Sequence, residues 1–255
     1  MRIVIDMQGA QTESRFRGIG RYTLSLAKAI VRNRGEHEII LAMSGLFPDT
    51  IESIRCEFNE LLPQENIRVW YAPGPVRECD QGNTWRREAA ELIREAFISS
   101  LQPDAVHIMS LFEGFVDDAV TSIGRFDRTA PVSVTTHDLI PLLYPDTYLN
   151  PNPPYKEHYL RKINYLQRSS LLLAISESSR QEGLDHAGLT NDSIINASEA
   201  ADEDFHPLKI SQSQAQILRD KFGLTRLFLL YTGGADKRKN LPRLIHAYAD
   251  RKSVV

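Results

Sequence analysis

The sequence lacks features that would favour several common classes of protein. Cysteine is scarce: Cys56 and Cys79 are the two in 255 residues, and they form no C-x-x-C pair. A zinc site or a disulfide framework needs more cysteines at closer spacing, so the sequence predicts neither. The formal net charge is −3, from 30 Lys and Arg against 33 Asp and Glu. This balance gives no electrostatic reason to expect nucleic-acid binding.

Long hydrophobic runs are also missing. A helix that crosses a bilayer needs roughly 18 or more apolar residues in succession, and the apolar runs of this sequence are far shorter. The N-terminus passes from Met1 and Arg2 directly into a strand-like run, without the apolar region and small-residue cleavage site of a secretory signal. We therefore expect a cytoplasmic protein.

Short apolar runs alternate with helical patterns along most of the chain. Arg2–Asp6 is typical of a buried first strand, and a helical spacing of apolar residues follows from Tyr22 to Val31. Further strands are predicted at 39–42, 67–71, 105–109, 131–136, 171–175 and 193–196, helices at 51–62, 85–101, 155–169 and from 177, and irregular structure at 144–154. This alternation predicts an α/β fold with a doubly wound, Rossmann-like parallel sheet.

A change in composition near residue 200 predicts a domain boundary. Residues 201–213 are acidic and polar, like an interdomain linker. After them come a predicted short helix at 214–222, a strand at 227–231 and a helix from 241. Because one such unit cannot bury its own apolar face, we expect residues 1–200 to form one domain and 214–255 to be the truncated start of a second Rossmann-like domain.

Polar residues follow several predicted strands, where parallel sheets bind their ligands. In Gly18-Ile-Gly20-Arg21, two glycines allow close approach of a phosphate to the backbone, the following helix offers free N–H groups, and Arg21 adds charge. A plain turn explains the same residues. Thr23 stands where a dinucleotide fingerprint has its third glycine, and no acid ends the second strand, which argues against a Rossmann-type oxidoreductase.

Two further motifs lie at strand ends. His137-Asp138 could orient or polarise a bound ligand, although a structural histidine would be placed equally well there. Ser176-Glu177 begins a predicted helix, where a serine cap followed by an acid is the ordinary explanation. A hydrolase would need G-x-S-x-G at this turn, and the sequence does not have it.

The predicted second domain carries a glycine-rich, cationic loop, residues 233–240. Backbone N–H groups and cations before a helix suit a diphosphate, although a run of charges is often only a solvated face. The loop lacks the Gly-Lys-Ser/Thr ending of a Walker motif. No cluster of residues with metal-ligand spacing is visible, so we predict no metal site.

Taken in order, five segments give the chain a resemblance to a known family. They are Gly18-Ile-Gly-Arg-Tyr22, Thr136-His-Asp-Leu-Ile-Pro141, Ile175-Ser-Glu-Ser-Ser-Arg180, Asp204-Phe-His-Pro207 and Gly233-Gly-Ala-Asp-Lys-Arg-Lys-Asn-Leu241. The set resembles family 4 glycosyltransferases of GT-B architecture, and most of all the bacterial mannosyltransferases that build polymannose O-antigen.

The resemblance implies roles for particular residues. Gly18, Gly20 and Arg21 would face the donor diphosphate, His137 would lie beside the transferred sugar as the catalytic residue, and Asp138 and Glu177 would help to bind the donor. Lys239 matches the lysine that grips the diphosphate. Gly234 stands where the family has an arginine, and Arg238 is the candidate to replace it. The family's Glu-x7-Glu pair would lie after residue 255.

The implied function is mannosyl transfer from GDP-mannose, with retention, in lipopolysaccharide synthesis. It needs a sugar nucleotide and a glycan acceptor, no other cofactor and no nucleic acid. Such an enzyme could associate peripherally with the cytoplasmic face of the inner membrane or with other polysaccharide-synthesis enzymes. We expect this chain to be an inactive N-terminal part of the enzyme. A non-catalytic module that binds a glycan or a partner is the alternative.

Overall fold

The structure is a computed structural model that describes residues 1–126, 128–202, 205–234 and 236–252. The chain divides into two compact units, residues 1–202 and residues 203–255. None of the described helices is long and apolar enough to cross a membrane.

The first unit is built on a seven-stranded sheet in which every pair of neighbours is parallel, in the order β3-β2-β1-β4-β5-β6-β7. The strands are β1 (Arg2–Asp6), β2 (Glu38–Ser44), β3 (Ile67–Trp70), β4 (Ala105–Ile108), β5 (Val132–Thr136), β6 (Leu171–Ala174) and β7 (Ile194–Asn196). The strand order reverses between β1 and β4, so the crevice where such sheets bind ligands is expected at the carboxyl ends of these two strands.

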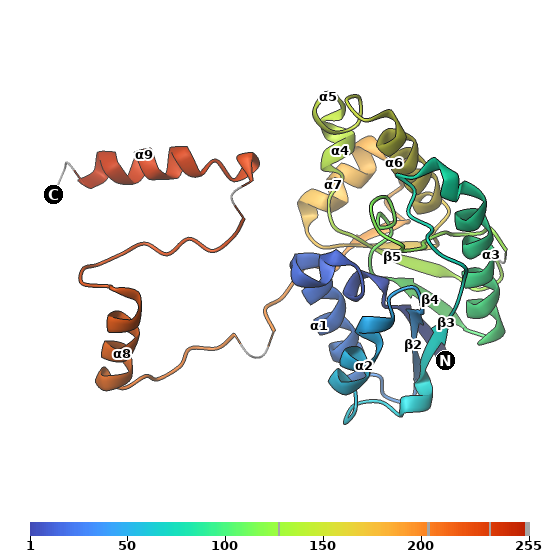
Figure 1. Cartoon of the computed structure of the whole chain (residues 1–255), viewed down its shortest axis with the longest axis horizontal. Coiled ribbons are helices and arrows are strands. Elements are labelled where there is room, and N and C mark those ends of the chain that lie inside the picture. Colours follow the sequence, from blue (N-terminus) through green and yellow to red (C-terminus); the bar gives the residue numbers. More distant parts are fainter. Residues whose placement is uncertain (127, 203–204, 235, 253–255) are drawn as a thin grey trace. The chain divides into compact units, whose positions relative to one another are not determined.

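Helices cover both faces of the sheet, because apolar residues of the central strands point alternately to each side (Figure 1). The helices are α1 (Gly18–Arg32), α2 (Pro48–Glu57), α3 (Thr84–Ser100), α4 (Ile140–Leu143), α5 (Pro145–Tyr148), α6 (Pro153–Leu166) and α7 (Glu177–His186). On β2, Ile39 packs in a core with Ala27 of α1, whereas Ile40 packs with Ile98 of α3. A further core joins Leu166 of α6 to β5 and β6. The predicted doubly wound α/β fold is confirmed.

Several local boundaries of the first unit differ from the prediction; helix α2, for example, covers Pro48–Glu57 instead of 51–62. Helix α1 begins at Gly18, four residues before the predicted start at Tyr22, so Gly18 and Gly20 are helical rather than in a loop. The apolar spacing could not reveal this turn, because its polar residues and glycines show no apolar stripe. The segment predicted to be irregular, 144–154, contains the one-turn helix α5 and the start of α6.

The described residues of the second unit form the α-helices α8 (Gln212–Phe222) and α9 (Leu241–Lys252) and the short 3-10 helix Lys237–Lys239. The strand predicted at 227–231 is wrong: these residues form no strand, either in the seven-stranded sheet or elsewhere among the described residues. Leu227 is 95% exposed and Leu230 is 78% exposed. A strand is stabilised by hydrogen bonds to a neighbouring strand, and the described part of this unit supplies none.

Candidate functional site

His137 follows directly after β5, at the carboxyl edge of the sheet. Its Nε2 donates to the carbonyl oxygen of Met109, 3.2 Å away, which orients the ring. Burial lowers the pKa of His137, although the hydrogen bond to Met109 and the charges of Glu199 and Asp138 oppose this effect. The imidazole is therefore held neutral at pH 7, with Nε2 as donor and Nδ1 as the remaining acceptor.

The ring of His137 also packs against Tyr22 of α1, edge to face, with 5.2 Å between ring centroids. The pKa of Tyr22 is raised by burial and by Glu199, whereas a hydrogen bond to Thr135 acts in the opposite direction. Sequence reasoning missed Tyr22 as a site residue. Its position one turn after Gly18 was a usable signal, because residues three or four apart share a helix face.

The predicted glycines play different parts at the start of α1. Gly18 is exposed, and a Cβ there would meet nothing within 4 Å. Gly20 is buried, and a Cβ there would lie 2.5 Å from the carbonyl oxygen of Ser14. Gly20 therefore allows two backbone segments to approach closely, and does not itself line an open site.

The N-terminus of α1 has the character of an anion site. No side chain caps the helix, so its first N–H groups remain available to a ligand. Arg17 and Arg21 are exposed beside this turn, and neither forms a side-chain hydrogen bond within the part of the chain that the structure describes. Helix dipole and guanidinium charge both favour a bound phosphate here.

Helix α7 reaches the same edge. The hydroxyl of Ser179 donates to the carbonyl oxygen of His137 over 2.5 Å, and Ser176 caps the helix by accepting from the N–H of Ser179. The predicted cap is thereby confirmed. Glu177 is exposed and pairs with Arg180 at 2.8 Å. Asp138 is exposed, and its Oδ1 accepts from the N–H of Ile140 at 3.2 Å.

The chain after β7 adds a residue that the sequence did not indicate. Asn196 accepts hydrogen bonds from the N–H and the hydroxyl of Ser198, which has a positive φ of 58°. This turn brings Glu199 close enough to influence both Tyr22 and His137 electrostatically. No local pattern in the sequence predicts a contact over such a separation. The structure thus brings together α1, β5, α7 and the segment after β7.

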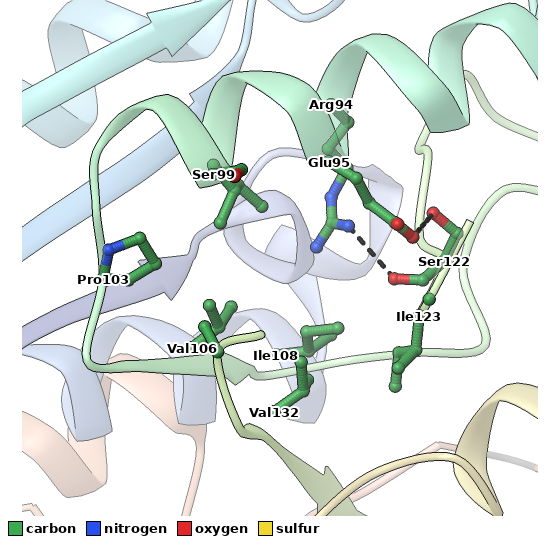
Figure 2. Close-up of a pocket in the computed structure, with 12 residues that line it drawn as sticks. Arg94, Glu95, Ser99, Pro103, Val106, Ile108, Ser122, Ile123 and Val132 are labelled. Carbon is green, nitrogen blue, oxygen red and sulfur yellow. Dashed lines mark hydrogen bonds between the residues drawn. The ribbon is translucent and has the colours of Figure 1, made fainter. Parts of the chain in front are cut away.

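A cavity of about 40 Å³ lies away from these residues, between α3 and the strands β4 and β5. Figure 2 shows that Arg94 and Glu95 reach from α3 toward Ser122, on one side of an otherwise mainly apolar lining. Arg94 donates to the carbonyl oxygen of Ser122 and pairs at 2.5 Å with Asp6, at the end of β1. None of the predicted site residues lines this cavity. Its charged side chains, Arg94 and Glu95, form interactions within the fold.

The remaining predicted site residues belong to the second unit. Arg238 and Lys239 lie in a short 3-10 turn, Lys237–Lys239, whose N-cap Asp236 accepts from the N–H of Arg238 at 2.8 Å. The side chain of Arg238 pairs with Asp236 at 3.1 Å, whereas Lys239 is exposed. Of the five segments that carry the family resemblance, Asp204 and Ala235 lie outside the described residues. Within the described part of the chain, no group of three or more potential ligands could hold a metal ion.

Comparison of the sequence with known proteins identifies the family of this chain. Residues 16–195 match the profile of Glycosyltransferase Family 4. The chain belongs to glycosyltransferase family 4. It is 35% identical over 250 residues to the serotype-specific mannosyltransferase WbdA of Escherichia coli, covering 98% of this chain and 30% of the relative. Another E. coli protein of the same description is 32% identical over 225 residues, 88% of this chain and 28% of the relative.

The family 4 chain thus spans 28–30% of the length of these relatives. Among solved structures, it is similar to a glycosyltransferase from Rickettsia africae, with a TM-score of 0.46 and 12% identity over 88% of this chain and 50% of that one. It is similar also to a UDP-GlcNAc 2-epimerase from Neisseria meningitidis, with a TM-score of 0.45 and 12% identity over 77% and 46%. The predicted family is therefore confirmed by sequence.

Proposed function

We propose that the chain forms the acceptor-side part of a mannosyltransferase that transfers mannose from GDP-mannose to a growing mannan, with retention of configuration. The observation that carries the proposal is the family 4 match, together with 32–35% identity to mannosyltransferases. The donor nucleotide, the retaining course and a role in O-antigen synthesis rest on the family resemblance of the sequence motifs.

The position of His137 supports a role beside the transferred sugar. Because Nε2 donates to Met109, the neutral imidazole offers Nδ1 as an acceptor for a sugar hydroxyl without adding charge. Met109 and Tyr22 fix its ring on two sides, and Ser179 holds its backbone. A catalytic group held in this way needs little rearrangement when the substrate binds.

Departure of the nucleotide leaves negative charge on the diphosphate. In our proposal, the free N–H groups at the start of α1 and the guanidinium of Arg21 stabilise this charge. Lys239 and Arg238 of the second unit contribute further cations, and Arg238 is already oriented by Asp236. Glu177 and Asp138, both exposed, accept hydrogen bonds from the donor. The reaction needs the sugar nucleotide and no other cofactor.

We place the enzyme in the cytoplasm, where GDP-mannose would be its donor, with peripheral association with the inner membrane or other polysaccharide-synthesis enzymes. Its partners are then a sugar nucleotide and a glycan acceptor.

A domain exchange tests the proposed function. Residues 1–250 would replace the matching segment of the E. coli relative, and transfer of labelled mannose from GDP-mannose to a mannose-primed acceptor would be measured. We expect transfer that is lost in the H137A variant of the hybrid, with a product of retained configuration by NMR. A folded hybrid that transfers nothing, while the segment it replaces is active, would contradict the proposal; if it still binds the glycan, a non-catalytic binding module is favoured.

A further inference from the structure

A carboxylate at the carboxyl edge of the sheet joins two segments that are far apart in the sequence. Glu113 follows β4, and its Oε1 accepts from the hydroxyl of Ser14 at 3.0 Å and from the hydroxyl of Ser110 at 3.2 Å. The side chain of Thr12 forms a further hydrogen bond with Glu113. Ser110 belongs to the same loop as Glu113, whereas Ser14 lies 99 residues earlier, just before α1. Glu113 therefore links the loop after β4 to the segment that leads into α1.

The loop that carries Glu113 is held firmly on both sides of this residue. The carbonyl oxygen of Phe112 accepts from Nε2 of the buried His158 at 3.2 Å. The carbonyl oxygen of Gly114 accepts from the N–H of Glu78 at 3.1 Å. The backbone of Glu113 is thus tied to two other segments of the first unit, and its carboxylate is a fixed point of attachment.

The segment at the other end of the link has little packing of its own. It is a short 3-10 helix, Glu13–Phe16, whose N-cap Thr12 accepts from the N–H of Ser14 at 3.2 Å. None of the four residues of this helix is buried, so apolar packing does not hold it in place. The hydrogen bonds that Ser14 and Thr12 form with Glu113 therefore attach the 3-10 helix to the edge of the sheet.

The same 3-10 helix lies directly against the first turn of α1. A Cβ on Gly20 would lie 2.2 Å from the Cα of Arg15, so this approach requires a residue without a side chain. The N–H of Arg17 donates to the carbonyl oxygen of Ser14 at 2.9 Å, and the carbonyl oxygen of Arg17 accepts from the N–H of Arg21 at 3.2 Å. A shift of the 3-10 helix is therefore transmitted to the start of α1, where the free N–H groups form the proposed diphosphate site.

The charge of Glu113 does not suit it to bind a diphosphate directly, since both groups are anionic. Burial and the charge of Asp117 raise the pKa of Glu113, against the hydrogen bonds from Ser14, Ser110 and Thr12. The surroundings thus disfavour the charged form, while both serine hydroxyls use an oxygen of the side chain as acceptor. The feature of Glu113 that the fold uses is this acceptor oxygen.

We propose that Glu113 is a positioning residue for the donor diphosphate. Its Oε1 holds Ser14, the 3-10 helix around Ser14 holds the first turn of α1, and that turn presents its N–H groups and Arg21 to the phosphates. The inference rests on the proposed function, because it names the support of the diphosphate site. Glu113 touches no phosphate in this role, and its effect on a bound anion passes through residues 13–21.

Titration of the purified chain with inorganic pyrophosphate tests this role. Pyrophosphate carries the phosphates without the sugar and the base, which this chain is not expected to position. The amide NMR resonances of Gly18 and Gly20 report binding at the start of α1. We expect E113A and S14A to bind about two- to fivefold more weakly than the wild type, the scale of an interaction at a helix terminus, and to shift both resonances before pyrophosphate is added. E113Q keeps an acceptor oxygen for both serine hydroxyls, and it should restore wild-type binding.

The matched control is S110A. Like S14A, it removes one hydrogen bond to Oε1 of Glu113, and the two bonds are of similar length. Ser110, however, lies on the loop of Glu113 and not before α1. S110A should therefore bind pyrophosphate as the wild type does and leave the resonances of Gly18 and Gly20 in place. Thermal melts establish which variants are folded, and S14A carries the test if E113A is not.

Several results would overturn the positioning role. Equal weakening by S14A and S110A would indicate a general loss of stability, and unchanged binding by S14A and E113A would show that the link does not shape the site. If E113Q bound as weakly as E113A, the charge and not the acceptor oxygen would matter. A wild type that binds no pyrophosphate at Gly18 and Gly20 would leave Glu113 no anion site to support. The proposed mannosyl transfer is judged separately by the domain exchange.

Discussion

Gly18 and Gly20 share the first turn of α1, but their surroundings differ, which permits a sharp test. A Cβ at Gly20 would lie 2.5 Å from the carbonyl oxygen of Ser14 and 2.7 Å from the backbone nitrogen of Arg15. Backbone atoms cannot move aside as a flexible side chain does. We therefore expect G20A to lower the free energy of unfolding by about 1–3 kcal/mol, as for overpacking of a core, measured by urea denaturation.

The matched control is G18A. At Gly18 a Cβ meets nothing within 4 Å, and alanine is the better helix former. G18A should leave stability unchanged or raise it by up to about 1 kcal/mol. Equal effects of G18A and G20A would show that the close approach of Gly20 to Ser14 does not constrain the fold.

The buried His107 leads us to predict how the stability of the fold depends on pH. It is 6% exposed on β4, with Nδ1 at 2.8 Å from the hydroxyl of Ser133 and Nε2 at 3.1 Å from that of Thr135. Burial lowers its pKa from 6.5 to about 4, against a smaller opposing effect of Asp6. Between these values the unfolded chain binds a proton that the folded chain does not. Stability should therefore fall as pH falls from 6.5 to 4, by up to about 3 kcal/mol from this residue.

The variant H107Q removes this titration and keeps a side chain that can form hydrogen bonds. Its stability should depend less on pH between 6.5 and 4 than that of the wild type, although His137 and His158, whose pKa values burial also lowers, still contribute. H186Q, at an exposed histidine of α7, is the control and should leave the profile unchanged. A profile for H107Q as steep as that of the wild type would contradict the prediction. The measurement is chemical denaturation at a series of pH values.

At the scale of elements, one buried carboxylate joins α3 to α6. Glu91 of α3 is 2% exposed and accepts from Arg161 at 2.5 Å, from Arg87 at 3.1 Å and from the hydroxyl of Tyr165 at 3.1 Å. Arg125 pairs with it at 3.2 Å. The variant E91Q removes the buried countercharge that these guanidinium groups share, and among the described residues only Arg87 and Arg161 keep a second carboxylate, that of Glu78. We expect a loss of about 3–5 kcal/mol in unfolding free energy, as when one partner of a buried ion pair is removed.

Glu88 on the same helix is the control for this prediction. Its carboxylate is half exposed and lies 3.7 Å from Arg87. E88Q should change stability by less than about 0.5 kcal/mol, because exposed ion pairs contribute little. A comparable loss in E88Q and E91Q, measured by thermal and urea unfolding, would mean that burial of Glu91 is not what makes its charge important.

The same scale shows how far sequence could predict the fold. The strands of the sheet were predictable because most are short apolar runs, and the central ones, such as β1 and β2, are largely buried on both faces. The first turn of α1 was not, since Gly18 to Arg21 carry no apolar stripe. The run at 227–231 has the composition of a strand, but strand formation depends on a partner that local sequence does not specify.

The candidate site, too, could be predicted from the sequence only in part. His137 and Ser176 could be found, because each directly follows a strand in a parallel sheet. Glu199 could not, since its electrostatic effects on Tyr22 and His137 join segments far apart in the chain. The predicted roles of Arg21, Glu177 and Lys239 stay predictions, because they concern a donor rather than the fold.

At the scale of the whole molecule, the two units differ in how firmly they can hold a ligand. The first unit buries hydrophobic side chains on both faces of its sheet. In the second unit, none of the residues 205–234 and 236–250 is buried. Lys239 and Arg238 thus stand on a turn that no packed core supports. A catalytic constellation must be held within about 0.5 Å of its productive geometry by packed neighbours.

We therefore expect the purified 255-residue chain to transfer no measurable mannose from GDP-mannose to a mannose-primed acceptor. Positioning of two substrates lowers the activation barrier by about 7–11 kcal/mol. In our proposal this chain positions only the acceptor, which its first unit binds. Acceptor binding should persist, since all seven strands of the sheet lie within the first unit. Radiolabel transfer is the measurement, with the active domain exchange as positive control. Turnover by the chain alone that is abolished by H137A would contradict this expectation. It would show that the first unit performs far more of the chemistry than the second unit.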